Sequence, residues 1–388
     1  MGSALSTFND FVDSTGPAYL SGPDAVVNEA VKNNYLLRRM LKGADMSRTL
    51  QGGSTIKDTI LFDEDSTFSF YQPNESFTWS NPQVLEAHEV NWRFAVDHMS
   101  WTDQEIELNA GGGLSKSARH HQFKRLKRVK EQRLWTSILN GMESALFAVP
   151  DKTKQETAGG TDPYSIPAFV NERTNGLFVN GAGGDWTVIE GINPATESKW
   201  RPQTVSYDNL TANDSANLLA AFDEMYLSVK FDTPPTKQEY FENPSLFAQF
   251  IACSKKGQKS YTQMLRASQD TLVTPGRQDP AYMKPQYAGI DLEYVSELDS
   301  AALYNDVATT GLATEEAADK IGARFYWLNG QYLAPVFHTS RYMVKHPVMT
   351  HPNQPFTHIV PCDSWYNVVC RSRQRQGIVS PTTDIAGF

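Results

Sequence analysis

Residues 114–147 read LSKSARHHQFKRLKRVKEQRLWTSILNGMESALF and carry the dominant helical pattern of the sequence. It contains no proline, the next one being Pro150, and its apolar side chains recur at the three- and four-residue spacing of one helix face. Such a helix would be about 50 Å long at ~1.5 Å per residue. Few compact domains need a helix of that length, so we expect an elongated molecule built along it. The apolar positions are Phe123, Leu126, Val129, Leu134, Ile138, Met142 and Leu146.

The charge of the chain reverses where this helix begins. Residues 58–115 contain eleven acidic residues, a single base (Arg93) and no lysine, whereas residues 116–133 contain eight bases and one acid, Glu131. Blocks of opposite charge attract each other, or attract the matching block of another copy. Three interpretations of the basic block stay open: a solvated helix face, a contact with nucleic-acid phosphates, or pairing with the acidic segment of a second copy. Its central bases are Lys124, Arg125, Lys127 and Arg128.

The acidic segment has the pattern of β-structure. Phe68 and Phe70 alternate with polar residues, residues 72–75 form a turn signal, and Phe77 and Trp79 alternate on its far side. This pattern predicts a long β-hairpin.

A second alternating stretch follows the hairpin. Val90, Trp92, Phe94 and Val96 occupy strictly alternate positions, which predicts a half-buried strand with all four side chains on one face. The three glycines Gly111, Gly112 and Gly113 then interrupt the chain before the long helix, and we interpret them as a hinge.

The rest of the chain mixes helices and strands, so the fold class is α+β. Helices are expected at 212–229 and 255–268, and buried strands at 247–253 and 290–295. Asn329-Gly330 separates two apolar runs, which predicts a β-hairpin.

A last strand is expected at residues 365–375. On such a strand Arg371, Arg373 and Arg375 would form a row on one face, which could meet DNA phosphates or water.

Signatures of catalysis and of metal binding are absent from the sequence. It contains no phosphate-binding loop, no dinucleotide fingerprint and no nucleophile elbow. The adjacent pair His120–His121 points in two directions on a helix, and the later histidines follow no ligand spacing. The three cysteines are too scattered for a disulfide framework, and no apolar run is long enough to cross a membrane. We therefore expect no enzyme, cofactor, metal site or membrane contact. The overall charge of −9 also argues against a dedicated nucleic-acid binder.

The order of these elements resembles the layout of tailed-bacteriophage major capsid (coat) proteins of the Hong Kong 97 type. Three stretches resemble motifs of this family: SWTDQEIELNAG at 100–111, EGINPATESKWR at 190–201 and WYNVVCRSR at 365–373. Together with the order of elements, the resemblance extends from about residue 55 to about residue 380.

The resemblance implies a Hong Kong 97-like capsid fold with five parts. They are an N-terminal arm (1–53), an extended β-hairpin loop (54–96), a peripheral domain (97–190) with a spine helix (114–147), an axial domain (191–334) and return strands of the peripheral domain (335–388).

The resemblance also implies a function: self-assembly into the icosahedral shell that encloses a phage dsDNA genome. The subunits would form hexamers and pentamers in the virion, after synthesis in the host cytoplasm. A separate scaffolding protein, a portal, a decoration protein and non-specific contact with packaged dsDNA are further implied partners. A lysine cross-link from the hairpin is excluded beyond Lys57, because residues 58–115 contain no lysine. The contacts between subunits would come from Phe68, Phe70, Phe77, Trp79, Trp92, Phe94, Lys124, Arg125, Lys127 and Arg128.

Two alternatives to a phage shell stay open at this stage. The first is the shell protein of an encapsulin-like bacterial nanocompartment, which would enclose protein cargo. The second is an unrecognised soluble enzyme, which should show a pocket lined by titratable groups with perturbed pKa values.

Overall fold

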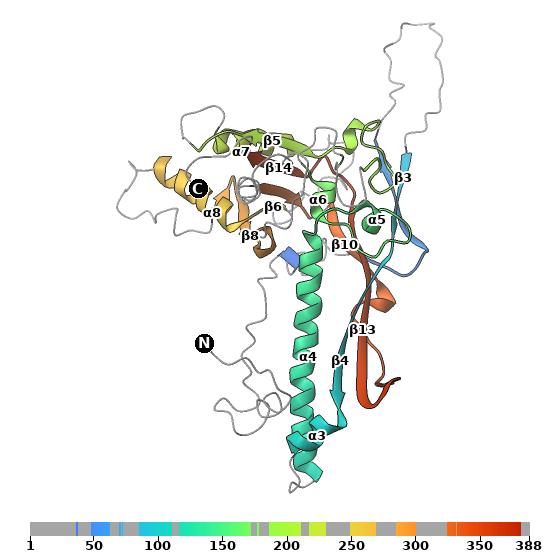
Figure 1. The fold of residues 1–388 in the computed structure, drawn as a ribbon. Helices are drawn as coiled ribbons and strands as arrows, with labels where there is room; N and C mark the ends of the chain where they lie inside the picture. The colour runs from blue at the N-terminus through green and yellow to red at the C-terminus, as the bar shows by residue number, and fades with distance from the viewer. Residues whose placement is uncertain are drawn as a thin grey trace.

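The computed structural model describes residues 36–37, 48–62, 70, 72, 85–110, 116–171, 177, 186–210, 217–229, 249–268, 285–299, 324–330 and 332–381. These residues form a broad body and a long stem (Figure 1). In the stem, helix α4 (Lys116–Leu146) lies alongside strands β4 (Arg93–Thr102) and β13 (Gln354–Cys370). Helix α4 has 31 residues and confirms the long helix expected from the apolar spacing.

The stem is held together by one face of the β4–β13 ladder. Met99 and Trp101 of β4 and Val360 and Cys362 of β13 pack against Leu134 of α4 as a buried cluster. The short helix α3 (Asp103–Ala110) follows β4 at the end of the stem far from the body.

Strand β13 is the centre of the first sheet. It pairs antiparallel with β4, β10 (Leu333–His338), β11 (Val344–Lys345) and β12 (Met349–His351). Strand β1 (Arg48–Leu50) adds to β10 in parallel. The first sheet thus runs from the body into the stem on a single strand of 17 residues.

The second sheet lies in the body and has the order β5-β14-β9-β6-β8-β7. Helices α7 (Leu218–Val229) and α8 (Lys255–Ser268) bring Phe222 and Tyr261 into its core. The expected helix at 255–268 and the strands near 249–253 and 290–294 are confirmed. The strands of this sheet are β5 (Gln203–Tyr207), β6 (Gln249–Cys253), β7 (Gln286–Tyr287), β8 (Ile290–Tyr294), β9 (Phe325–Asn329) and β14 (Gly377–Pro381).

Short elements complete the body between these sheets. They are α5 (Lys152–Gln155), α6 (Ile166–Phe169) and the 3₁₀ turns η1 (Ser198–Trp200), η5 (Ser296–Asp299) and η8 (Thr339–Arg341).

The β-hairpin expected in the acidic segment has paired arms. Strand β2 (Thr55–Leu61) pairs antiparallel with β3 (Leu85–Asn91), in a register that joins Thr55 to Asn91 and Leu61 to Leu85. Of the four aromatic residues expected near its tip, Phe70 is described and is 91% exposed. Phe68, Phe77 and Trp79 lie outside the described residues, as do the expected hinge glycines Gly111, Gly112 and Gly113.

The prediction of a β-hairpin at Asn329-Gly330 is wrong, although the chain does turn there. The backbone N–H of Tyr332 donates to the carbonyl of Asn329 across 3.1 Å. The flanking strands then separate, because β9 pairs with β6 and β14 in the second sheet while β10 pairs with β13 and β1 in the first. The turn signal is local, whereas the choice of sheet depends on partners distant in sequence.

The last strand also differs from expectation. Strand β13 ends at Cys370, and the chain then turns into β14, which pairs with β5 and β9 of the second sheet. The range 335–388 therefore does not form one set of return strands.

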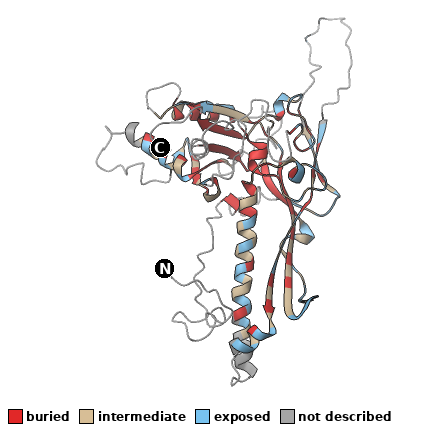
Figure 2. Cartoon of the chain, in the orientation of Figure 1, coloured by how far each residue is buried: buried red, intermediate tan, exposed pale blue. Residues whose placement is uncertain are grey.

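Burial follows this architecture (Figure 2). Buried residues concentrate in the body, and buried and exposed residues alternate along α4 and β4. Within the part of the chain that the structure describes, no helix combines the length and apolar character of a membrane span.

Candidate subunit interface

The outward face of β4 exposes two large apolar side chains. Phe94 is 64% exposed and Val96 is 74% exposed. The ladder places Phe94 opposite Trp365 and Val96 opposite Asp363 on β13, and the rings of Phe94 and Trp365 meet edge to face at 4.9 Å. We call Phe94, Val96 and Trp365 the outer stem face.

The exposure of Phe94 and Val96 contradicts the prediction that Val90, Trp92, Phe94 and Val96 share one buried face. Val90 and Trp92 are buried, but the buried side changes at Trp92, between β3 and β4. On β4 the odd-numbered positions are the more buried ones, and Met99 among them packs against α4.

Trp92 is not available to another subunit, contrary to expectation. It is 7% exposed, and its indole N–H donates to the carbonyl of Gly53 at 3.0 Å. Its ring also meets His338 edge to face at 5.5 Å. Trp92 therefore anchors the start of β4 within its own chain.

Helix α4 exposes a basic surface near its N-terminal end. Lys124, Lys127 and Arg128 are exposed, while the side chain of Arg125 lies outside the described set. Among the described residues of α4 the acids are Glu131, which pairs with Lys345, and Glu143, which is fully buried. This exposed surface is thus positive.

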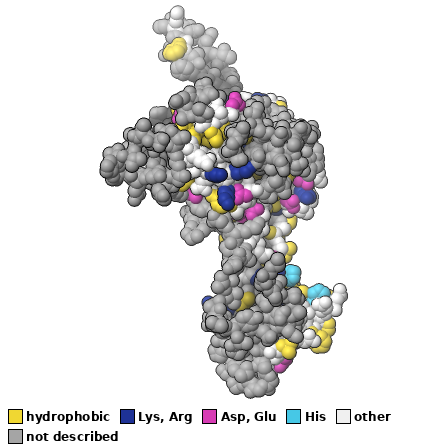
Figure 3. Space-filling model, turned by 60° about the vertical axis from the view of Figure 1, so that its left-hand side comes forward, with side chains coloured by type: hydrophobic (Ala, Val, Ile, Leu, Met, Phe, Trp, Pro, Cys, Tyr) yellow, Lys and Arg dark blue, Asp and Glu magenta, His cyan; other side chains and the backbone are white. Residues whose placement is uncertain are grey.

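The acidic and basic blocks meet partly within one subunit. Lys130 of α4 pairs with Glu105 of α3 at 2.5 Å, and its ammonium also donates to the carbonyl of Ser100 at 2.7 Å. Both side chains are largely buried, so this pair fixes α3 on α4. On the body, Figure 3 shows Lys or Arg side chains (blue) next to Asp or Glu side chains (magenta).

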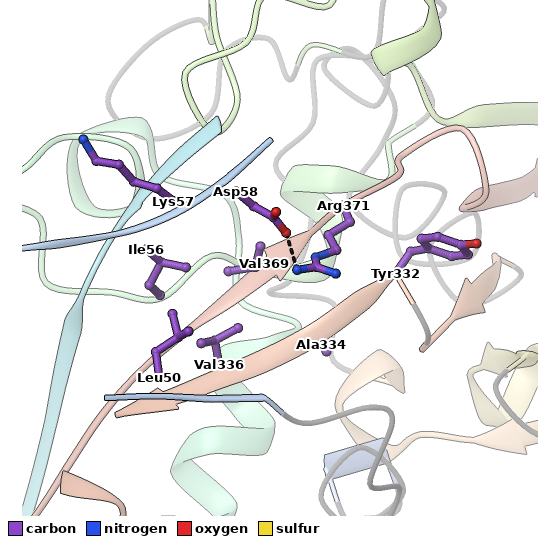
Figure 4. A pocket seen from close by; sticks show the side chains of 9 residues that line it. All are labelled: Leu50, Ile56, Lys57, Asp58, Tyr332, Ala334, Val336, Val369 and Arg371. Carbon is purple, nitrogen blue, oxygen red and sulfur yellow. Dashed lines mark ion pairs between the residues drawn. The ribbon is translucent and has the colours of Figure 1, made fainter. Parts of the chain in front are cut away.

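A hollow of ≈ 90 Å³ that opens to solvent lies where the hairpin joins the first sheet (Figure 4). Leu50, Ile56 and Val336 gather on one side of it, whereas Lys57 points away from the other labelled side chains. Asp58 and Arg371 form an ion pair beside it. The remaining lining residues are Tyr332, Ala334 and Val369.

The three arginines Arg371, Arg373 and Arg375 do not form the DNA-facing row expected from the sequence. β13 ends at Cys370, so they lie in a turn rather than on a strand, and Arg371 pairs with Asp58. The guanidinium of Arg375 lies 4.2 Å above the ring of Tyr332.

Arg373 is fully buried, which excludes it from contact with DNA. Its guanidinium donates twice to the carbonyl of Phe169, at 2.9 and 2.7 Å, and once to that of Trp200 at 3.0 Å. Burial lowers the pKa of Arg373 to about 10, although the charge of the nearby Glu190 carboxylate acts in the opposite direction. Arg373 is therefore a structural residue that ties the end of α6 and the 3₁₀ turn η1 to the turn after β13.

Groups with shifted pKa values are mostly interior. Burial raises the pKa of Glu143 to about 7, although the backbone N–H groups of Leu37 and Leu36 act in the opposite direction. Burial likewise raises the pKa of the thiols of Cys253 and Cys370. Among the described residues, no three His, Cys, Asp or Glu side chains lie together as a metal site would require.

The fold matches known capsid structures over almost its whole length. The cyanophage A-1(L) capsid asymmetric unit matches with a TM-score of 0.54 at 12% identity, covering 97% of this chain and 99% of that chain. The capsid of the native GTA particle matches with a TM-score of 0.53 at 10% identity, covering 99% and 100%. Gordonia phage Cozz matches at 0.50 with 10% identity, covering 98% and 96%.

The sequence alone finds no such relatives. No family model matches it, and no curated protein matches it either. At these low identities the structural matches show the fold, and they confirm the expected α+β, Hong Kong 97-like capsid fold.

Proposed function

We propose that this chain is the major capsid protein of a tailed phage and assembles into the icosahedral shell that encloses its dsDNA genome. One observation carries the proposal: the fold matches the cyanophage capsid subunit over 97% of this chain and 99% of that one. We accordingly propose a structural role in the virion and no catalytic role.

The outer stem face supports assembly with further copies. Burying an aromatic or aliphatic side chain of this size is worth about 1.5–3 kcal/mol. Phe94 and Val96 therefore offer a few kcal/mol to a neighbour, and closed symmetry repeats that gain at every subunit. We propose that hexamers and pentamers form in this way, with the β2–β3 hairpin of one subunit reaching over the next.

We propose that the exposed bases of α4 orient two subunits as they meet and contribute little of the binding energy. Opposed charges at an interface accelerate encounter and fix register more than they add affinity. We propose that Lys124, Lys127 and Arg128, with Arg125, meet the acidic hairpin segment of a neighbouring copy. Phe68, Phe70, Phe77 and Trp79 are proposed as the apolar contacts of that hairpin.

The domain divisions, the hinge and the assembly partners are proposed from the likeness to capsid proteins. The divisions into arm, hairpin, peripheral domain and axial domain stay as proposed above, except that β14 lies in the second sheet. We propose Gly111–Gly113 as the hinge between α3 and α4. A separate scaffolding protein, a portal, a decoration protein and packaged dsDNA are proposed partners, with assembly in the host cytoplasm.

The test is electron microscopy of the purified protein in negative stain, alone and with its co-expressed assembly partners. We expect closed particles that package dsDNA when the portal and packaging enzymes are present. Particles that hold protein cargo and no DNA under those conditions would identify a nanocompartment instead, and subunits that never assemble would contradict the shell function.

The outer stem face is tested by Phe94→Asp combined with Val96→Asp. We expect folded subunits, by circular dichroism, that form no particles. The control is Leu227→Asp on α7, which places a charge at a similarly exposed apolar position, 73% exposed. Normal particles from the Phe94/Val96 variant would remove this face from the interface.

A further inference from the structure

A histidine and a glutamate form a buried pair at the root of the hairpin. His88 lies on β3, and Glu190 lies in the turn between Ile189 and Ile192. Both side chains are 0% exposed, and Nδ1 of His88 lies 3.3 Å from Oε2 of Glu190. The pair therefore joins the hairpin to the body without contact with solvent.

The backbone at Glu190 is strained, which suggests that its carboxyl group is needed there. Ile189 and Ile192 exchange two hydrogen bonds, of 2.9 and 3.1 Å, around Glu190 at φ 53° and Gly191 at φ 81°. Left-handed angles at both central positions define a type I′ turn, which favours Gly, Asn or Asp at the first of them. A glutamate in this conformation costs about 1–2 kcal/mol relative to glycine.

The carboxyl group is held on one side and incompletely satisfied on the other. Oε1 of Glu190 accepts a hydrogen bond from the backbone N–H of Cys370 at 3.0 Å. Within the described part of the chain, Oε2 of Glu190 and both ring nitrogens of His88 make no well-formed hydrogen bond. The 3.3 Å contact joins Nδ1 of His88 to Oε2 of Glu190, so the link between the two side chains depends on charge.

Charged and titratable groups face this pair from every side. On β2, Asp58 stands directly opposite His88 in the ladder. The backbone N–H of Glu89, next to His88, donates to the carbonyl of Glu190 at 3.2 Å, and the ring of Trp200 lies 6.4 Å from that of His88. The other facing groups are Glu156, Tyr164, Cys370 and Arg373.

Protonation of His88 decides the charge balance of the pair. Burial alone would lower the pKa of His88, but the contact with Glu190 and the charges of Glu190 and Asp58 together raise it. Burial raises the pKa of Glu190 as well, against the effects of His88, Cys370 and Arg373. Both pKa values are raised in the folded state, so the stability that this pair contributes is present at low pH and is lost as the pH rises through those values.

We propose that His88 and Glu190 form a proton-dependent latch for the β2–β3 hairpin. With His88 protonated, an ion pair fixes β3 on the turn at Glu190. When His88 loses its proton, the buried carboxylate loses its nearest opposite charge and the root of the hairpin loosens. The meaning of the latch rests on the proposed function, because a hairpin that changes direction changes its contacts with a neighbouring subunit.

Hydrogen exchange of the dispersed full-length subunit tests the latch directly. Protection factors, corrected for intrinsic exchange, are compared at about pH 6 and about pH 8.5 for peptides covering 55–61 and 85–91. We expect protection of the hairpin to fall by a factor of about three or more relative to the β6–β8 ladder of the second sheet. A hairpin whose protection follows the β6–β8 ladder at both pH values would overturn the proposal without any variant.

Variants separate the latch from the rest of the hairpin. His88→Gln should abolish the pH dependence, and Glu190→Gly should lower hairpin protection at both pH values while relieving the strained turn. The control is Glu89→Gln, because Glu89 pairs with Lys57 on the exposed side of the same ladder at 3.4 Å. The wild-type pH dependence should survive in that control; survival in His88→Gln would refute the latch.

The exchange experiment stands apart from the proposed function. It uses dispersed subunits, so a failure to form particles leaves its outcome unchanged. Particles that assemble normally from a hairpin without pH dependence would remove the latch alone.

Discussion

Replacing Arg373 with alanine is expected to destabilise the subunit by about 3–5 kcal/mol, the range for removing one partner from a buried charged contact. The guanidinium is fully buried and bonds the carbonyls of Phe169, at the end of α6, and Trp200, at the end of η1. Its carbon also lies 5.9 Å from the ring centre of Trp200. Alanine would keep none of these contacts.

The magnitude follows from the groups left behind. Each buried carbonyl that loses its donor costs about 1–3 kcal/mol, and the variant leaves two of them. A typical domain is stable by only about 5–15 kcal/mol, so the loss is a large share of the total. Arg371→Ala is the matched control, because its ion pair with Asp58 lies near the surface and such pairs contribute about 0–1 kcal/mol.

The assay is urea denaturation of dispersed subunits followed by tryptophan fluorescence. Arg373→Ala should lower the midpoint strongly or prevent soluble expression, and Arg371→Ala should change it little. If Arg373→Ala unfolded at the wild-type urea concentration and instead bound DNA more weakly, the buried role of Arg373 would be refuted and the basic row restored.

Two further predictions concern α4. Replacing Lys124, Arg125, Lys127 and Arg128 with glutamate should leave folded subunits that assemble poorly. Glutamate at Lys255 and Lys259 on α8 is the control and should leave assembly unchanged. Normal particles of the first variant in negative stain would refute the charge-pairing hypothesis. For Glu143, whose pKa is raised from 4.5 to about 7, the contribution to stability is full below about pH 4.5 and falls by about 3 kcal/mol as the pH rises through 7. Glu143→Gln should remove this dependence, measured as the difference in unfolding free energy between about pH 5 and about pH 8, and an unchanged difference would contradict the buried carboxyl.

The helices α4 and α8 could be predicted because their signals are local. The helical spacing from Phe123 to Leu146 lies within one element, and α4 spans nearly the expected range. The helix α8 begins and ends where its sequence predicts. In each case the residues that bury one another are neighbours on one helix face, so no knowledge of distant partners is needed.

The candidate contact residues could be predicted only in part, because burial depends on the opposing surface. Trp92 and Phe94 look alike in an alternating pattern, yet Trp92 is buried and Phe94 is exposed. Arg371 and Arg373 look alike in a basic row, yet the first lies beside a hollow and the second inside the body. What separates the members of each pair is the loop or helix packed against one of them, and that element comes from far along the chain.

The same long-range packing explains why the root of the hairpin is a point of control. The chain passes from β9 of the second sheet to β10 of the first, and later from β13 of the first sheet to β14 of the second. The side chain of Gln376 joins these two crossings by bonding both backbone groups of Asn329, at 2.8 and 3.1 Å.

Cys370 and Arg373, at the second crossing, contact Glu190 and the loop at Trp200, and Glu190 in turn contacts His88 of the hairpin. Hairpin, stem and body therefore share one small set of buried bonds. Because the stem strand β13 ends inside that set, a change in the charge of His88 acts at the junction of all three parts, whereas a change at the exposed Lys57–Glu89 pair acts on the hairpin alone.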